Sequence, residues 1–304
     1  MAVMQKEQLS YEMLLEKSKD TGISFSNLLG GAVLEEIVRR ISVSEYGENL
    51  WLRSGTVLGI RQYKKNLVLT LEYIYIIFKP NKKNKEMTDQ MLLSELQLKL
   101  SENVFLEKND YGILFEMKTK IQKKNLSIQF LAKVGDMKVP VALKVHLLRD
   151  EKKIPKKENF SCMMFPNIQI SYNSYPAEGY LAEKYMEIIT KLELIQDIGA
   201  YYDIYYLLEK ESVDGRKVRE YIEDKCEELH IAKEKDRLET VAGYKDYTYM
   251  KKKWKVFLRS INSKEPSWEK AVERFINFFE PIWRAILEDM AFFGDWMPDL
   301  NRFL

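Results

Sequence analysis

The sequence predicts an α+β fold in which a mixed-sheet domain is followed by an all-helical domain. Much of the stretch from residue 50 to 171 consists of short β-branched or alternating segments bounded by Gly, Asn, Asp or Pro, which is the pattern of strands. After Pro176 the apolar residues instead recur at three- and four-residue spacing, the pattern of amphipathic helices. The change falls near residue 172, so we expect domains at 1–172 and 173–304.

In the first domain the pattern moves from helices into strands. Helical spacing covers residues 7–19, 24–42 and 88–100, and Thr88 is placed to cap the third helix. The expected strands are residues 50–52, 67–78, 112–120, 125–134, 139–148 and 163–171. Because the connections between the later segments are short, we expect antiparallel neighbours there.

In the second domain we expect helices throughout. The segments with helical periodicity are residues 177–191, 199–211, 215–230, 246–261 and 267–291. The last segment is the clearest, since one face carries Trp268, Phe275, Phe279 and Trp283 and ends with Met290. An aromatic stripe at helical spacing is more often core packing than a cofactor pocket, so we assign it to the core.

The composition restricts the class of protein. The chain has 304 residues, of which 46% are hydrophobic, enough for a sizeable core, and its formal net charge of +2 argues against a polyanion covering the whole surface. The two cysteines show neither metal-ligand spacing nor a disulfide framework, which fits a reducing cytoplasm. The longest apolar run, residues 67–78, is too short for a membrane span and contains Glu72. We therefore expect a cytoplasmic protein without membrane contact.

Several pieces of sequence occur in a specific order. A helix ending at Tyr46 precedes Asn-Leu-Trp-Leu-Arg-Ser-Gly-Thr-Val-Leu at 49–58, and Tyr-Pro-Ala-Glu at 175–178 precedes Tyr-Asp-Ile-Tyr at 202–205 and a tryptophan helix at 254–257. In this order, over about residues 20 to 260, the chain resembles the AbiEii/AbiGii abortive-infection toxin family of nucleotidyltransferases. The resemblance implies transfer of a nucleoside monophosphate from an NTP to a tRNA or protein, within a phage-defence or toxin–antitoxin system.

Nucleotidyl transfer sets a requirement for acidic residues. Two hard cations usually hold the triphosphate and neutralise charge on the attacking and leaving oxygens, and such cations take oxygen ligands. The superfamily pattern is a Gly-Gly or Gly-Ser turn after a strand, then Asp-x-Asp or Asp-x-Glu on the next strand and a third acid on a later one. Alternation along a strand points the first two acids at the same ions.

This chain departs from that pattern at the acids. The resemblance places Ser54, Gly55 and Thr56 at the nucleotide-binding turn, with Ser54 in the place of the first glycine. It places Thr70 and Glu72 at the paired acids, so a hydroxyl replaces the first carboxylate, and the third position falls near His146, where no carboxylate stands. One carboxylate and one hydroxyl make a poor Mg²⁺ site. We predict that metal-dependent transfer is reduced or lost; if it persists, Mg²⁺ is the cofactor and Glu72 its ligand.

The resemblance also assigns two residues of the second domain. Lys184 stands where the family uses a lysine near the triphosphate, and Asp203 is the surviving acid of the following helix, so the implied catalytic set is Glu72, Lys184 and Asp203. From the residues alone, Lys184 fits a solvated helix face. Asp203 lies among tyrosines and would accept a hydrogen bond from one of their hydroxyls or from Lys184.

A second function class is a pseudoenzyme that acts by binding a nucleotide, an RNA or a protein. Basic runs at residues 79–85, 118–124, 152–157 and 251–255 fit either a solvated surface or contact with an RNA backbone. The resemblance adds an antitoxin or regulator protein as a further partner. Two or more acids close to Glu72 would favour the enzyme, whereas Glu72 alone would favour the binding protein.

Overall fold

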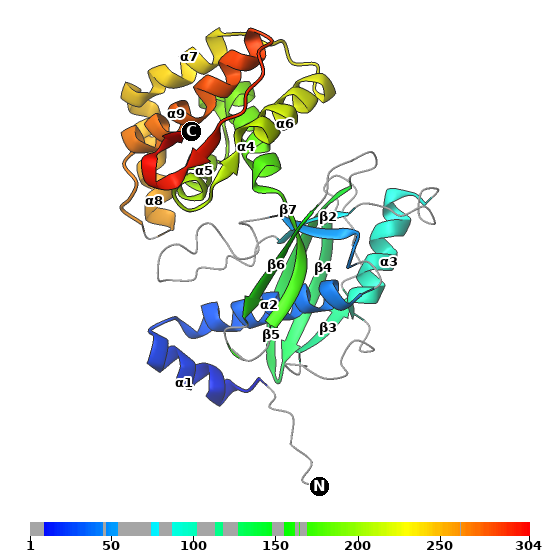
Figure 1. Cartoon of the computed structure of the whole chain (residues 1–304). Helices are drawn as coiled ribbons and strands as arrows, with labels where there is room; N and C mark the ends of the chain where they lie inside the picture. The colour runs from blue at the N-terminus through cyan, green and yellow to red at the C-terminus, as the bar shows by residue number, and fades with distance from the viewer. Residues whose placement is uncertain are drawn as a thin grey trace. The chain divides into compact units, whose positions relative to one another are not determined.

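The chain divides into two compact units, Met1–Tyr175 and Pro176–Leu304 (Figure 1). The computed structural model describes residues 9–44, 47–53, 74–78, 87–101, 113–117, 127–147, 155–161, 164, 169–261 and 263–304. Residue 172, where the sequence pattern changes, lies inside the strand β7 (Gln169–Tyr175). The division comes after this strand because β7 keeps its partners in the first sheet up to Tyr175.

The described part of the first unit contains a seven-stranded mixed sheet in the order β3-β4-β5-β2-β1-β7-β6. Its strands, besides β7, are β1 (Leu50–Arg53), β2 (Ile74–Phe78), β3 (Ile113–Met117), β4 (Ser127–Val134), β5 (Met137–Leu147) and β6 (Lys156–Ser161). The β1–β7 and β2–β5 pairs are parallel, and the other neighbours are antiparallel. The predicted mixed sheet is therefore confirmed.

The details of strand placement differ from the sequence prediction in two places. In the described residues, the predicted strand at 163–171 corresponds to β7, which continues past the predicted end to Tyr175. The strand β6 was not predicted, because its sequence, Lys-Lys-Glu-Asn-Phe-Ser, lacks apolar alternation. β6 is an edge strand, and lysines are common on edges because they discourage pairing with other chains.

A short connection joins β4 and β5 as antiparallel neighbours, as predicted. Val134 lies opposite Met137, so two residues form the turn of an antiparallel hairpin. The first of them, Gly135, has a φ of 57°, a left-handed conformation that glycine adopts without a steric penalty. Gly135 therefore helps to fix the register of the two strands.

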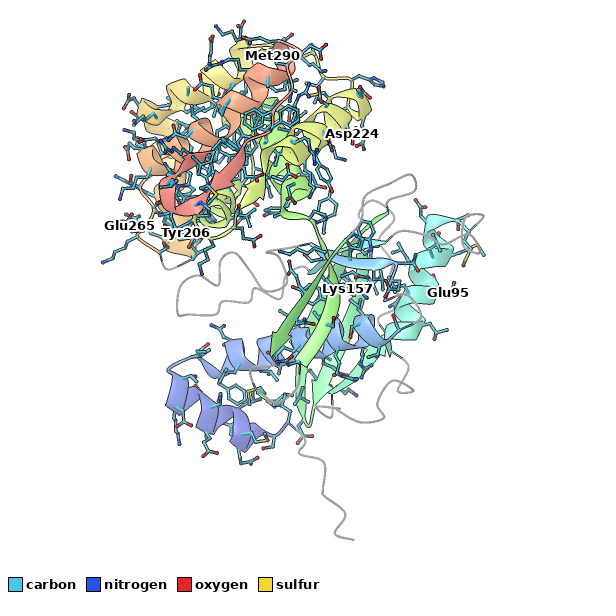
Figure 2. All side chains as sticks on the ribbon, viewed as in Figure 1. Glu95, Lys157, Tyr206, Asp224, Glu265 and Met290 are labelled. Carbon is cyan, nitrogen blue, oxygen red and sulfur yellow. The ribbon has the colours of Figure 1, made fainter. Side chains whose placement is uncertain are left out.

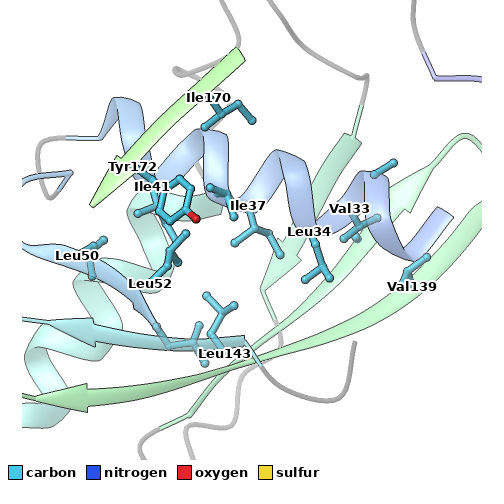
Figure 3. Packing of buried hydrophobic residues seen from close by; sticks show 14 of the residues in the cluster. Val33, Leu34, Ile37, Ile41, Leu50, Leu52, Val139, Leu143, Ile170 and Tyr172 are labelled. Carbon is cyan, nitrogen blue, oxygen red and sulfur yellow. The ribbon is translucent and has the colours of Figure 1, made fainter. Parts of the chain in front are cut away.

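Three helices accompany this sheet: α1 (Tyr11–Thr21), α2 (Phe25–Val43) and α3 (Asp89–Ser101). The Ser24 hydroxyl caps α2 by accepting from the Asn27 backbone N–H. α2 contacts β7, and its apolar residues lie beside Leu50, Leu143 and Tyr172 from three strands (Figure 3). Because every residue from Leu28 to Ile41 is buried, α2 is the central element of this core.

Charged side chains are buried within α2. The Glu36 carboxylate, which is fully buried, accepts from Arg39 at 2.7 and 2.8 Å and from Arg40 at 2.8 Å. Arg39 and Arg40 are also buried. Charges are retained in an interior only when they are paired and hydrogen-bonded, so these contacts contribute to making the burial of Glu36, Arg39 and Arg40 tolerable.

The second unit is predominantly helical, as predicted. Its helices are α4 (Ala177–Lys191), α5 (Gly199–Lys210), α6 (Gly215–Glu228), α7 (Asp236–Gly243), α8 (Thr248–Ser260) and α9 (Trp268–Leu287). α4 and α9 each contact α5, α6 and α7, so these two helices form the centre of this unit. The sequence prediction omitted α7 and extended α9 to residue 291, whereas Met290 lies beyond the helix and is 49% exposed.

A small sheet corrects the expectation that this unit is all helix. β8 (Val213–Asp214), β9 (Asp295–Met297) and β10 (Arg302–Phe303) form three antiparallel strands in the order β10-β9-β8. Strands of two or three residues are too short to show alternation, so the sequence pattern does not reveal them. The C-terminal residues are joined to the helices through this sheet.

Aromatic side chains form the core of the second unit, which confirms the assignment of the α9 stripe. Phe275 lies 5.9 Å from the Tyr185 ring and 5.3 Å from the Tyr201 ring, between centroids. The Tyr206 hydroxyl finds a backbone partner: it donates to the Glu265 carbonyl at 3.3 Å, and both residues are labelled in Figure 2. Among the residues that the structure places, no helix has the length and apolar character of a membrane span.

Candidate functional site

The strand pairing places one end of each of three strands, β1, β7 and β2, at the same end of the first sheet. Arg53, the last residue of β1, is paired with Tyr175, the last residue of β7. β2 runs antiparallel to β1, with Leu50 opposite Phe78, so Ile74 at the start of β2 lies at this same end. The segment 54–73, which connects β1 to β2, therefore leaves and re-enters the sheet through neighbouring strands.

The predicted nucleotide-binding and metal-binding residues of the first domain belong to this connecting segment. Ser54, Gly55, Thr56, Thr70 and Glu72 all lie outside the described residues, and only the strands that flank them are placed.

β5, the strand on which the sequence lacks a third acid, runs parallel to β2. Leu143 is opposite Ile74, and His146 is opposite Ile77. β5, which carries the position expected for the third acid, is therefore the neighbour of β2, the strand that follows Glu72 in the sequence. Among the placed residues, no three His, Cys, Asp or Glu side chains come together as metal ligands.

In the second unit, Asp203 is buried and serves as a hydrogen-bond acceptor. It lies on α5, and its Oδ2 accepts from the Tyr180 hydroxyl of α4 at 2.8 Å. The sequence predicted a tyrosine donor but looked for it among the neighbours of Asp203 in α5. A buried carboxylate can take a donor from any packed element, and α4 contacts α5.

Lys184 is held on the same pair of helices by two carboxylates. Its Nζ lies 3.3 Å from Glu187 Oε2 and 3.8 Å from Asp197 Oδ2, and its side chain is largely buried. Asp197 also accepts from the Gly199 backbone N–H at 3.0 Å, at the start of α5. Lys184 is therefore an ion-pairing residue between α4 and the segment before α5 rather than a solvated lysine.

Tyr180 connects the two predicted residues, although the sequence prediction did not include it. The Lys184 ammonium lies 5.8 Å from the centroid of the Tyr180 ring, while the Tyr180 hydroxyl donates to Asp203. Residues i and i+4 of a helix share a face, so the spacing of Tyr180 and Lys184 was a usable signal. The structure thus brings Lys184, Tyr180 and Asp203 together as one cluster.

We expect Asp203→Ala to destabilise the second unit by about 1–3 kcal/mol, because a buried tyrosine hydroxyl loses its acceptor. Urea unfolding followed by tryptophan fluorescence measures the change. Tyr180→Phe and the double variant complete a mutant cycle, and we expect the double variant to lose less than the sum of the two single losses. Additive losses would show that the Tyr180–Asp203 contact does not contribute to stability.

The structure describes the four basic runs of the sequence to different extents. Residues 79–85 and 118–124 lie outside the described residues, and of 152–157 only the last three are placed, with Lys156 and Lys157 exposed on β6. In the run at 251–255, Trp254 is buried and its indole N–H donates to the Pro266 carbonyl at 2.9 Å. Trp254 is therefore a core residue.

Comparison with known proteins gives similarity only to solved structures. No protein-family model matches the sequence, and no curated protein matches it. A candidate nucleotidyltransferase from Helicobacter pylori is similar over 88% of this chain and 100% of its own, with 12% identity and a TM-score of 0.45. The Helicobacter pylori protein JHP933 is similar over 93% of this chain and 96% of its own, with 12% identity and a TM-score of 0.42.

Proposed function

We propose that the chain is a nucleotidyltransferase-like protein that binds a nucleoside triphosphate and whose metal-dependent transfer is reduced or lost. The observation that supports this proposal is the strand order β5-β2-β1-β7. In this order β1, the strand before Ser54–Thr56, is paired with β2, the strand after Glu72. β5 is paired with β2 on its other side. The resemblance requires this neighbourhood for a nucleotide site.

In this proposal the first unit supplies the nucleotide-binding segment. Ser54, Gly55 and Thr56 contact the phosphates, Thr70 contributes a neutral hydroxyl, and Glu72 remains as the single carboxylate. A lost metal-binding acid removes anionic oxygen that hard cations need, and the expected loss of transfer rate is on the order of 10³-fold. If transfer is retained, Mg²⁺ would be its cofactor and Glu72 its ligand.

Lys184 is the residue that we propose to contact phosphate in the second unit, with Asp203 as its support. A phosphate that binds Lys184 must compete with the carboxylates of Glu187 and Asp197, which hold it in the unliganded chain. Asp203 acts through Tyr180, because its Oδ2 is occupied by the Tyr180 hydroxyl. This makes Asp203 a positioning residue.

The finer parts of the function are proposals of the same kind. The acceptor of the nucleotide would be a tRNA or a protein. The chain would act in the cytoplasm as a toxin of a phage-defence or toxin–antitoxin system. An antitoxin or regulator protein would be a further partner. The second candidate function is a pseudoenzyme that binds nucleotide, RNA or protein without turnover. It is favoured by Thr70 and His146 at positions where the transferases carry acids.

Nucleotide binding provides the test. We expect Lys184→Gln to weaken binding of labelled ATP or CTP about 10- to 100-fold, the effect of losing a charged hydrogen bond. Equilibrium dialysis with Mg²⁺ or with EDTA measures the affinity. Lys191→Gln is the matched control, because Lys191 also pairs with Glu187, at 3.4 Å, but is more exposed and lies two turns further along α4.

Incubation of the chain with labelled nucleotides and total RNA distinguishes the two candidate functions, with Glu72→Ala as the control. Binding without turnover, unchanged in Glu72→Ala, supports the pseudoenzyme. Turnover that requires Mg²⁺ and disappears in Glu72→Ala would show that catalysis is intact. Absence of nucleotide binding at millimolar concentration would refute the transferase and leave a pseudoenzyme only in the form that binds RNA or protein.

A further inference from the structure

The outward face of α8 carries cations and an exposed aromatic ring. This basic face consists of Tyr249, Lys252, Lys255, Val256 and Arg259, all exposed. The opposite face of the helix is anchored in the core by Met250, Trp254 and Leu258. The basic face is thus displayed on a helix whose orientation is set by packing within its own unit.

The charge of α8 is unusually one-sided. The helix contains four lysines, one arginine and no acidic residue. Lys251 is neutralised by Glu269 at 2.8 Å and Asp246 at 3.6 Å, and Lys253 donates to the Ile195 carbonyl.

Within the part of the chain that the structure describes, the remaining three cations of α8 have no such partners. Across the described ranges, no carboxylate lies within ion-pair distance of Lys252, Lys255 or Arg259, whose positions span about 10 Å of helix axis. A row of unneutralised cations along one face of a helix is the electrostatic footprint of a nucleic-acid binding surface.

Tyrosine rings lie at the N-terminal end of this row. Tyr249 is 51% exposed and Tyr247 is 44% exposed, and their ring centroids are 5.9 Å apart. The Lys253 ammonium lies 5.9 Å from the Tyr249 centroid and keeps positive charge beside the ring. An exposed ring next to cations is a platform on which an unpaired base can stack.

We propose that the basic face of α8 binds single-stranded nucleic acid. Lys252, Lys255 and Arg259 contact successive phosphates, and one base stacks on Tyr249. A second copy of α8 is a poor occupant, since the three unneutralised cations of one basic face would meet the same three of the other. This surface goes beyond the nucleotide site proposed above, and its binding is measured without any nucleoside triphosphate.

The experiment uses a fluorescein-labelled 15-nucleotide poly(U) RNA and fluorescence anisotropy over a series of salt concentrations. We expect the triple variant Lys252→Gln, Lys255→Gln, Arg259→Gln to weaken binding and to reduce the slope of log K against log salt by about 2, which is roughly 0.7 per lost phosphate contact. Tyr249→Leu should weaken binding about five- to 100-fold, whereas Tyr249→Phe, which keeps the ring, should bind as the parent does.

The matched control is Arg216→Gln, Lys217→Gln, Lys235→Gln, because it also removes three exposed cations, none of which lies on α8. Loss of binding equal to that of the α8 triple variant would show that net charge, not the basic face, retains RNA. The proposal would be overturned if the parent chain fails to retain RNA at 50 mM salt. It would also be overturned if a poly-glutamate chain displaces the RNA stoichiometrically, because an acidic protein segment would then be the preferred partner.

Discussion

Glu36→Gln is expected to lower the free energy of unfolding of the first unit by about 3–5 kcal/mol, the cost of removing one partner from a buried ion pair. The side chain of Glu36 is fully buried and that of Arg40 is 1% exposed, so solvent cannot replace the lost negative charge. Glutamine has a similar volume, so the change removes charge without opening a cavity. Hydrogen exchange of α2 peptides, together with urea unfolding, measures the effect on this unit.

The control for this prediction is Glu16→Gln on α1. Glu16 is exposed, and a surface change of this kind usually stays within about 0.5 kcal/mol. Arg40→Gln combined with Glu36→Gln should recover part of the loss, because the double variant no longer buries the Arg40 charge. A loss below about 1 kcal/mol for Glu36→Gln would contradict the burial of the three charges.

Phe275→Ala is expected to destabilise the second unit by about 3–5 kcal/mol, the usual cost of deleting a buried aromatic ring. Phe275 is fully buried, and its ring contacts Tyr185, Tyr201 and Phe279. The surrounding side chains come from different helices, so they cannot close the cavity by a shift of one element. Tryptophan fluorescence follows the change, since Trp254, Trp268, Trp283 and Trp296 all belong to this unit.

The control is Tyr201→Phe, because the Tyr201 ring contacts that of Phe275. This change should raise the stability of the unit instead of lowering it. The Tyr201 hydroxyl is buried and has no hydrogen-bond partner among the residues that the structure places, and its burial raises the pKa of the phenol. Removing an unsatisfied buried hydroxyl should stabilise the unit by about 1 kcal/mol. A Phe275→Ala loss below about 1 kcal/mol would contradict the role of this ring in the core.

The helices of the second unit were predictable because their apolar residues repeat over several turns. Trp268 to Trp283 on α9 is the clearest case, and the structure places this stripe in the core. Segments without such repetition were not found: α7 has eight residues, and the strands of the small sheet have two or three. Periodicity identifies an element only when the element is long enough to show it.

The sequence predicts site residues, but which side chains they contact depends on the packing. The sequence named Lys184 and Asp203 through a resemblance, and the structure adds Tyr180 between them. Residues 54–56, 70 and 72 stay predictions, because they lie outside the described residues.

The sequence by itself determined which segments are amphipathic and where strands give way to helices. These properties follow from residue order, because periodicity and composition are local. Only the tertiary structure decided that Glu36 pairs with two buried arginines, that Asp203 accepts from the Tyr180 hydroxyl, and that Lys252, Lys255 and Arg259 are exposed while Trp254 is buried. Those outcomes depend on which surfaces meet when elements pack, and packing joins residues that no local pattern relates.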